Sequence, residues 1–275
     1  SRTDAFSRRI SQSLVGAAGA GIMSVAARPW EWEDVRAETD ENGVHLTHVA
    51  EPAELLLRNG RLVKGAGYDA ASPVARRSLA RVGAILRLRA RGRYLVHAAA
   101  VVDPKGGAWV LAGDSGSGKS TLAWVLVRQG WSLLGDDGVL IEDAEGGVIA
   151  RAWRDPLRVS LGLAKQFPEL AGLAGRVSAR DPRARVPVER EVVRQAPVRT
   201  ILFLERSERD RVLRVGPAVT LASLVRQSPW VLIDDEDAPH HLTVLAAVAD
   251  SVPAYHLAHT PSQLEELPRT LAKLS

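Results

Sequence analysis

The residues with the clearest chemical potential form a glycine-rich segment, GDSGSGKST, at positions 113–121. It fits the pattern G-x-x-x-x-G-K-[S/T], which a chain of this length matches by chance roughly once in a hundred. Glycines let successive backbone N–H groups converge on phosphate oxygens, and the helix that follows presents its positive N-terminal end to the same anion. Lys119 would reach the β- and γ-phosphates, while the Ser120 hydroxyl would hold Mg²⁺. The segment therefore predicts a P-loop that binds ATP with Mg²⁺. The expected binding residues are Gly113, Asp114, Ser115, Gly116, Ser117, Gly118, Lys119, Ser120 and Thr121.

Two adjacent carboxylates, Asp136 and Asp137, follow a short apolar stretch at 131–134. One helix and one strand separate them from Lys119, so we expect a parallel β-α-β step to return the chain beside the P-loop strand. Both carboxylates would then lie at the edge of the sheet where the phosphates bind. One of them would bind Mg²⁺ with Ser120, and the other would take a proton from an attacking hydroxyl. The residues themselves leave open which carboxylate does which.

His97 is the third candidate, in a β run at 94–102. A single histidine there is most often structural. Its run forms a predicted hairpin with the P-loop strand, however, so its imidazole could lie near the γ-phosphate and handle charge or a proton. The expected catalytic residues are thus Asp137, Asp136, His97 and Lys119.

Three weaker candidates lie further along the chain. An apolar run ends in Asp234 and Asp235 near His240 and His241, which is a possible metal site. Glu205–Arg206 ends another apolar run and could face the same sheet edge. The third is a proline- and arginine-rich segment at 176–199, expected to be a long loop, in which one arginine could clamp a phosphate; the candidates are Arg183 and Arg185.

The elements around these residues predict an α/β fold, with a mixed sheet and flanking helices. Strands are expected at 94–102, 108–112, 131–134, 139–142, 148–153, 200–204 and 254–257, and helices at 121–129, 160–171, 218–227, 240–249 and 262–274. Before them, short alternating pieces at 30–67, with Asn-Gly turns at 42–43 and 59–60, predict a small β-rich lobe, followed by a helix at 73–91. We therefore expect an accessory lobe at 1–70 and a catalytic domain at 71–275.

Composition limits the classes of function. The 275 residues are 46% apolar, enough for a full core, and include no cysteine, which excludes disulfides and thiol catalysis. The net charge of +4 comes with only 5% aromatic residues, so we expect no nucleic-acid partner.

The pair Arg8–Arg9 and the small apolar run at 14–27 have the outline of a signal peptide, but the run is too short to span a bilayer. We expect a cytoplasmic protein with no membrane partner.

Three segments together carry a family resemblance: LVHAAAV at 95–101, GDSGSGKST at 113–121 and GWSLLGDD at 130–137. They resemble the HPr kinase/phosphorylase family, and more closely its smaller bacterial relatives, which include kinases that phosphorylate a serine of lasso-peptide precursors. The resemblance implies a nucleotide-binding core like that of phosphoenolpyruvate carboxykinase. It also implies that Lys119 and Ser120 handle phosphates and Mg²⁺, that His97 assists, and that Asp137 is the general base toward a seryl hydroxyl.

The chain departs from the founding enzymes after the Asp pair. It reads AWRDPLR at 152–158, where they carry a glycine-rich signature that contains a glutamate. The resemblance therefore does not identify HPr as the substrate. Our first expectation is an ATP-dependent kinase of a serine-type hydroxyl on a peptide or protein. The alternatives are a kinase of a small hydroxyl metabolite and a nucleotide-dependent regulatory module without phosphotransfer; the oligomeric state is left open.

Overall fold

The computed structural model describes residues 30–32, 34–145, 147–153, 158–160, 167–170, 183–185, 193–234, 237–260, 267 and 271. The chain forms a mixed α/β protein with two compact units. One, here called the N-terminal unit, comprises residues 1–94 and 228–243. The other, the P-loop unit, comprises residues 95–227 and 244–275. Within the described residues, no helix has both the length and the apolar character that crossing a bilayer requires.

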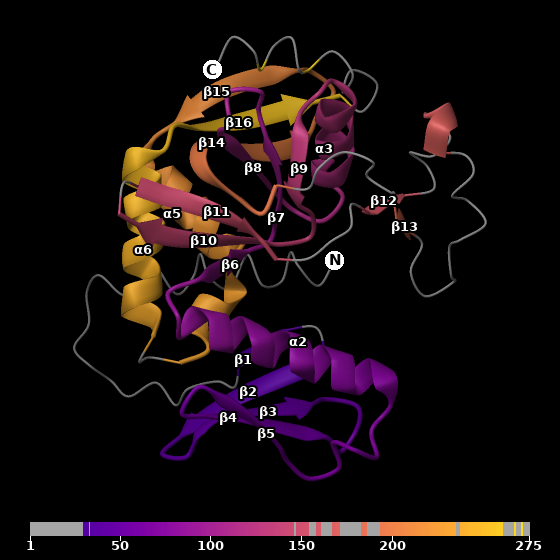
Figure 1. Cartoon of the computed structure of the whole chain (residues 1–275), viewed down its shortest axis with the longest axis vertical. Coiled ribbons are helices and arrows are strands. Elements are labelled where there is room, and N and C mark those ends of the chain that lie inside the picture. Colours follow the sequence, from indigo (N-terminus) through magenta and orange to yellow (C-terminus); the bar gives the residue numbers. More distant parts are fainter. Residues whose placement is uncertain are drawn as a thin grey trace. The chain divides into compact units, whose positions relative to one another are not determined.

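The N-terminal unit contains a five-stranded antiparallel meander on which one long helix packs (Figure 1). Its elements are β1 (Trp30–Trp32), β2 (Val35–Asp40), β3 (Gly43–His48), β4 (Glu54–Arg58), β5 (Arg61–Lys64) and α2 (Pro73–Arg89). The β2–β3 and β4–β5 connections lie at the predicted Asn-Gly turns, where Gly43 and Gly60 have positive φ. The predicted β-rich lobe and the helix after it are both present.

Helix α2 belongs to this unit because its apolar face packs on the sheet. Leu79, Val82, Ile85 and Leu86 are all buried, and a Cβ added to Gly83 would lie 2.7 Å from the Leu62 side chain. Such close packing joins the helix to β4 and its neighbours. The compact unit consequently runs to Tyr94 and takes in residues 228–243, whereas the sequence suggested a boundary at residue 70.

The P-loop unit contains a curled mixed sheet of nine strands. Seven strands follow the order β6-β10-β11-β14-β8-β7-β9, β16 pairs with β14, and β15 pairs with β16. The bounds are β6 (Tyr94–Val96), β7 (Ala98–Val102), β8 (Ala108–Ala112), β9 (Ser132–Gly135), β10 (Val139–Ala144), β11 (Gly147–Ala152), β14 (Gln195–Arg206), β15 (Arg211–Val215) and β16 (Ala254–His259). This confirms the expected mixed sheet.

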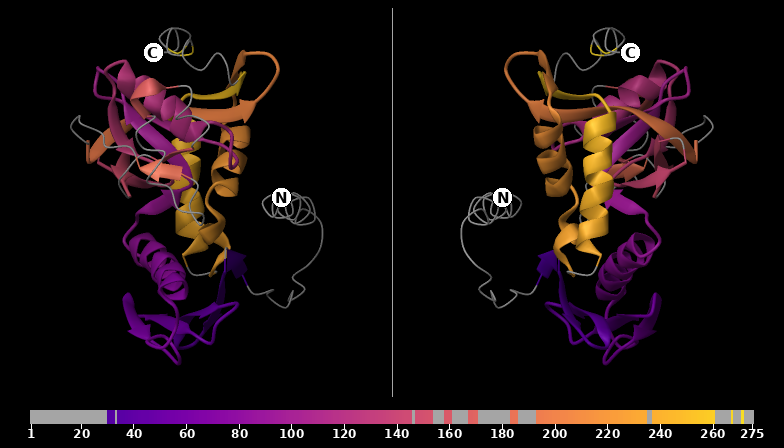
Figure 2. Two further views of the ribbon diagram at one scale, coloured as in Figure 1. Left: turned by 90° about the vertical axis from the view of Figure 1, so that its right-hand side faces the viewer. Right: turned by 90° about the vertical axis from the view of Figure 1, so that its left-hand side faces the viewer.

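Helix α3 (Lys119–Arg128) packs on β7, β8 and β9. Its Leu122, Val125 and Leu126 join a core cluster that includes Trp109 and Leu111. Helix α5 (Pro217–Arg226) lies across the strands from α3 (Figure 2). Both helices were expected, as was α6 (Ala238–Ser251), which is longer than predicted at both ends.

Three expectations about the elements need correction. The run at 94–102 is not one strand: it breaks at His97, where β6 turns to pair with β10 while β7 pairs with β8 and β9. Strand β9 runs parallel to β8 but is not beside it, because the antiparallel β7 lies between them. The expected loop at 176–199 includes β13 (Arg183–Arg185), paired with β12 (Arg158–Ser160), and the start of β14.

Other expectations fall largely outside the described part of the chain. Of the helix expected at 160–171, Ser160 instead ends β12 and residues 168–170 form a single 3-10 turn. In the helix expected at 262–274, only Leu267 and Leu271 are described, and both are buried. The signal-peptide-like run at 14–27 lies wholly outside the described residues.

Candidate active site

The glycine-rich segment forms a tight loop between β8 and α3. Gly113, Gly116 and Gly118 all have positive φ, at 145°, 82° and 100°, which side chains rarely tolerate. At Gly113 there is also no room, since an added Cβ would lie 2.5 Å from the carbonyl oxygen of Leu204 on β14. The loop therefore curls directly from the strand into the first turn of α3, and Gly118, as the N-cap, has no side chain that could cover the helix end.

Lys119 is 8% exposed and folds back across this loop. Its Nζ donates hydrogen bonds to the carbonyl oxygens of Gly113, at 2.7 Å, and Asp114, at 3.0 Å. These contacts hold the ammonium group over the first half of the loop. A charged donor held by neutral carbonyls can exchange them for phosphate oxygens, which bear more charge.

Ser120 and Asp136 form the next contact at the site. Ser120 Oγ donates a 2.8 Å hydrogen bond to Asp136 Oδ1, and Asp136 is 4% exposed. A hydroxyl and a carboxylate are the hard oxygen ligands that suit Mg²⁺, which usually takes one or two protein ligands and completes its shell with phosphates and waters. The donor set fits that ion, although no group of three His, Asp or Glu side chains lies close together among the described residues.

Asp137 has different surroundings from its neighbour. Its φ is 63°, an uncommon conformation for a residue other than glycine, and it turns the side chain toward His97. Asp137 Oδ1 lies 3.8 Å from His97 Nδ1, and the two side chains are 31% and 30% exposed. One carboxylate is thus buried against the P-loop helix, while the other is partly exposed beside an imidazole.

Strand register explains why these residues meet. Ala98 of β7 pairs with Ala112 of β8, and Ala100 pairs with Gly135 of β9. The start of β7 therefore lies level with the ends of β8 and β9, which places His97, the P-loop and the Asp pair at one sheet edge. The expected β-α-β step does reach this edge, but with the His97 strand between the other two.

Helix α5 supports this arrangement through its C-cap residue, Gln227, which is buried. The carbonyl oxygen of Gln227 accepts a 2.8 Å hydrogen bond from the backbone N–H of His97, at the break between β6 and β7. Its side-chain amide donates to Asp114 Oδ1 at 3.4 Å. Sequence reasoning missed Gln227, because a glutamine at a helix end has no spacing that marks it as part of a site.

A hollow of about 380 Å³ adjoins the P-loop. It is lined by residues 113–117 of the loop, by the end of β14 and by side chains of α5 and β16: Phe203, Leu204, Glu205, Arg206, Ser223, Arg226 and His256. The candidates Glu205 and Arg206 therefore do lie at the same sheet edge as the P-loop. Glu205 pairs with His256 at 3.0 Å, and Arg226 pairs with Asp114 at 3.3 Å.

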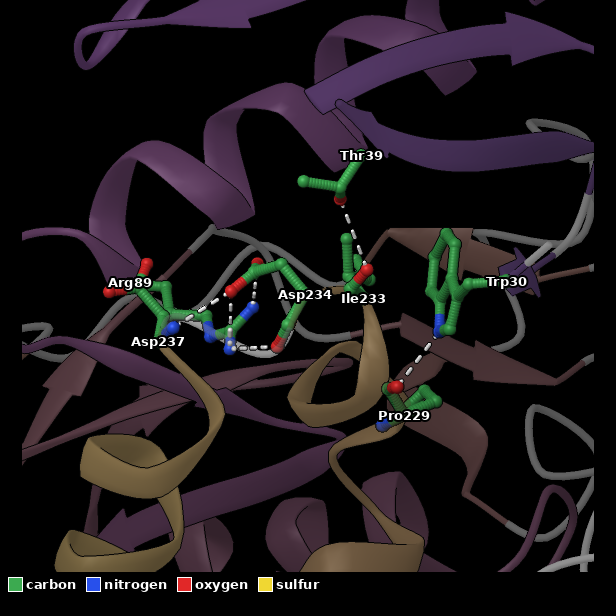
Figure 3. A network of polar contacts seen from close by, with 7 residues as sticks. All are labelled: Trp30, Thr39, Arg89, Pro229, Ile233, Asp234 and Asp237. Atoms are coloured by element: carbon green, nitrogen blue, oxygen red, sulfur yellow. Dashed lines mark hydrogen bonds and ion pairs between the residues drawn. The ribbon is translucent and has the colours of Figure 1, made fainter. Parts of the chain in front are cut away.

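The possible metal site near Asp234 has another explanation. Asp234 forms a 2.6 Å ion pair with Arg89, whose side chain is 1% exposed (Figure 3). It also accepts a hydrogen bond from the backbone N–H of Asp237. His241 stacks on Tyr94 with ring centroids 4.3 Å apart. Burial first, and then the positive charge of Arg89, lowers the pKa of His241 to about 3. Arg89 and Asp234 neutralise one another within the N-terminal unit, and Asp235 lies outside the described residues.

No protein-family model and no curated protein matches the sequence. Among solved structures, the chain is similar to the HPr(Ser) kinase/phosphatase from Coxiella burnetii, with 16% sequence identity and a TM-score of 0.38. The aligned part covers 65% of this chain and 88% of that chain. Because so distant a likeness says nothing about activity, a function has to follow from the geometry of the site itself. The chain is a mixed α/β protein with a distant structural similarity to this kinase.

Proposed function

We propose that the protein is an ATP-dependent phosphotransferase that transfers the γ-phosphoryl group to a serine-type hydroxyl of a peptide or protein. One observation carries this proposal: the P-loop with Lys119, the Ser120–Asp136 pair and the His97–Asp137 pair lie at a single sheet edge. A phosphate cradle, a pair of hard oxygen ligands and a solvent-accessible carboxylate are the parts that this chemistry requires.

The two carboxylates would have separate roles. Asp136 is buried and already bonded to Ser120, so it suits the metal side of the site. A bound Mg²⁺ would supply charge neutralisation for the phosphates. Asp137 is partly exposed, so an acceptor can reach it. His97, 3.8 Å away, would orient the Asp137 carboxylate and, when protonated, offset its charge.

These residues can carry out each part of the transfer step. The acceptor oxygen forms a bond to the γ-phosphorus as the bond from that phosphorus to the β–γ bridging oxygen breaks. The hydroxyl proton passes to a carboxylate oxygen of Asp137, and ADP leaves with the bridging oxygen. Lys119 would leave the carbonyls of Gly113 and Asp114 to bind the phosphates, offsetting the charge on the leaving group. Since ATP is held inside the cell, we propose a cytoplasmic location.

The direct test is to incubate the protein with Mg-ATP and the peptides encoded beside its gene, and to look by mass spectrometry for the gain of one phosphoryl group. Asp137→Asn should slow the gain by about a hundredfold or more while ATP still binds, because the amide cannot accept the proton. Asp143→Asn is the matched control, an exposed aspartate on β10 in the same unit. Phosphorylation by Asp137→Asn at the wild-type rate would exclude Asp137 as the base.

A second candidate is the phosphorylation of a small hydroxyl compound. The hollow of about 380 Å³ favours it, because the space beside the first half of the P-loop is of small-molecule size and its lining comes entirely from the P-loop unit. Turnover with small alcohols, and none with any peptide, would establish this candidate over the first. Slow ATP hydrolysis that no acceptor stimulates would instead favour a regulatory module.

A further inference from the structure

His259, the last residue of β16, contacts the P-loop from within the core. Its exposure is 0%, and its Nε2 lies 2.7 Å from the carbonyl oxygen of Ser117, 142 residues away in sequence. A carbonyl oxygen can only accept a hydrogen bond, so Nε2 carries the proton and donates it. No described residue hydrogen-bonds to Nδ1. The geometry therefore specifies the Nε2–H tautomer.

This hydrogen bond fixes the direction of one peptide group. In a trans peptide the C=O and the following N–H point in opposite directions. Because the Ser117 carbonyl points at His259, the Gly118 N–H points away from His259. Gly118 directly precedes Lys119 and α3, and its N–H belongs to the run of backbone donors that cradles phosphates in this type of loop.

The imidazole also contacts Gly118 itself. A Cβ added to Gly118 would lie 3.0 Å from both Cε1 and Nε2 of His259, and the φ of Gly118 is 100°. The ring therefore holds the Ser117–Gly118 peptide by a hydrogen bond and by packing. A loop whose donors are already oriented loses less conformational freedom when the anion binds.

We propose that His259 is a positioning residue that presets the Ser117–Gly118 peptide for binding the phosphates of the nucleotide. This inference rests on the proposed nucleotide site and adds a residue that the transfer step does not use. Strand pairing places it there, because β16 runs parallel to β14 with His259 level with Arg206, at the same sheet edge as the loop.

Two substitutions separate the hydrogen bond from the packing. His259→Leu removes the donor, and His259→Gln keeps an N–H near the position of Nε2. The half-buried His45 of the N-terminal unit, far from the P-loop in sequence, provides the control His45→Leu. Calorimetric titration with a non-hydrolysable Mg-ATP analogue should show roughly three- to tenfold weaker binding for His259→Leu, which is the usual effect of losing one hydrogen bond. His259→Gln and His45→Leu should bind within about twofold of the wild type.

If His259 had only a structural role, the variant would have a lower melting temperature and an unchanged affinity for the Mg-ATP analogue. His259→Leu leaves the Ser117 carbonyl without its donor but also removes the buried, unpartnered Nδ1, so its melting temperature without nucleotide should fall only modestly. Its affinity, measured at a temperature where the variant is fully folded, should fall as stated. In turnover assays the KM for ATP should rise more than kcat falls. Wild-type affinity in a folded His259→Leu variant would overturn the inference and leave the proposed function standing, whereas no nucleotide binding by the wild type would overturn both.

A measurement on the wild-type protein keeps the inference testable even if His259→Leu does not fold. Nitrogen NMR of the His259 ring should show a protonated Nε2 and an unprotonated Nδ1. A ring protonated only at Nδ1 could not donate to the Ser117 carbonyl, and that result would overturn the inference.

Discussion

Asp136 Oδ1 accepts a 2.8 Å hydrogen bond from Ser120 Oγ, so the first of the two carboxylates is bonded to the first turn of the P-loop helix. Asp137, the next residue, faces outward beside His97. Two chemically identical side chains at consecutive positions therefore have different surroundings.

Asp136→Asn should raise the Mg²⁺ concentration needed for half-maximal turnover by at least about tenfold, because the amide loses the charge that attracts the ion. Asp137→Asn should leave this Mg²⁺ requirement nearly unchanged and lower kcat by about a hundredfold or more, the typical effect of removing a general base. Titrating Mg²⁺ against turnover for both variants checks the assignment. If the Mg²⁺ requirement rose with Asp137→Asn and not with Asp136→Asn, the two roles would be reversed.

Gly113→Ala should destabilise the protein by clearly more than Gly106→Ala. Both glycines have positive φ, but an added Cβ meets nothing within 4 Å at Gly106 and lies 2.5 Å from the Leu204 carbonyl oxygen at Gly113. The positive φ alone strains an alanine by about 1–3 kcal/mol at either position. Urea unfolding of the two variants isolates the steric part, and equal losses would show that β14 yields to the new methyl group. Only Gly113→Ala should also weaken ATP binding.

Arg89→Met or Asp234→Asn alone should destabilise the N-terminal unit by about 3–5 kcal/mol, because each leaves the other group buried without its partner. The double variant should lose less than the sum of the two. Lys64→Met is the control, since the Lys64–Asp69 pair has side chains 61% and 73% exposed and should contribute at most about 1 kcal/mol. Chemical unfolding measures all four. Additive losses would show that the two groups act independently.

Acid should destabilise the fold through His241. Its pKa is lowered from 6.5 to about 3, so between these values the unfolded chain binds a proton that the folded protein does not. Stability from this residue is complete above pH 6.5 and decreases as the pH falls toward 3. The free energy of unfolding of the wild type, relative to His241→Phe, should therefore fall by up to about 1.4 kcal/mol per pH unit across this window. A phenyl ring can keep the stacking on Tyr94. A difference that stays constant from pH 7 to pH 4 would contradict the buried, neutral state of His241.

Local spacing was enough to predict the P-loop and its neighbours. A glycine-rich turn between a strand and a helix is encoded within nine residues, 113–121, and its conformation depends mainly on glycines that tolerate positive φ. The Asn-Gly turns and the apolar faces of α2 and α3 are likewise local patterns. For the same reason, most helices and strands lie close to where periodicity placed them.

Only the tertiary structure decided how distant segments meet at the edge of the sheet that carries the P-loop. The sequence placed β9 beside β8, but β7 lies between them, because strand order depends on which backbones pair and not on their order along the chain. The sequence alone did not assign different roles to Asp136 and Asp137, because adjacent residues of one type differ only in their neighbours in space. Gln227 and His259 reach the site through α5 and β16, more than a hundred residues beyond the P-loop, and no local pattern marks them. The sequence by itself determined the glycine-rich loop and its candidate partners, whereas long-range strand pairing decided which side chains surround them.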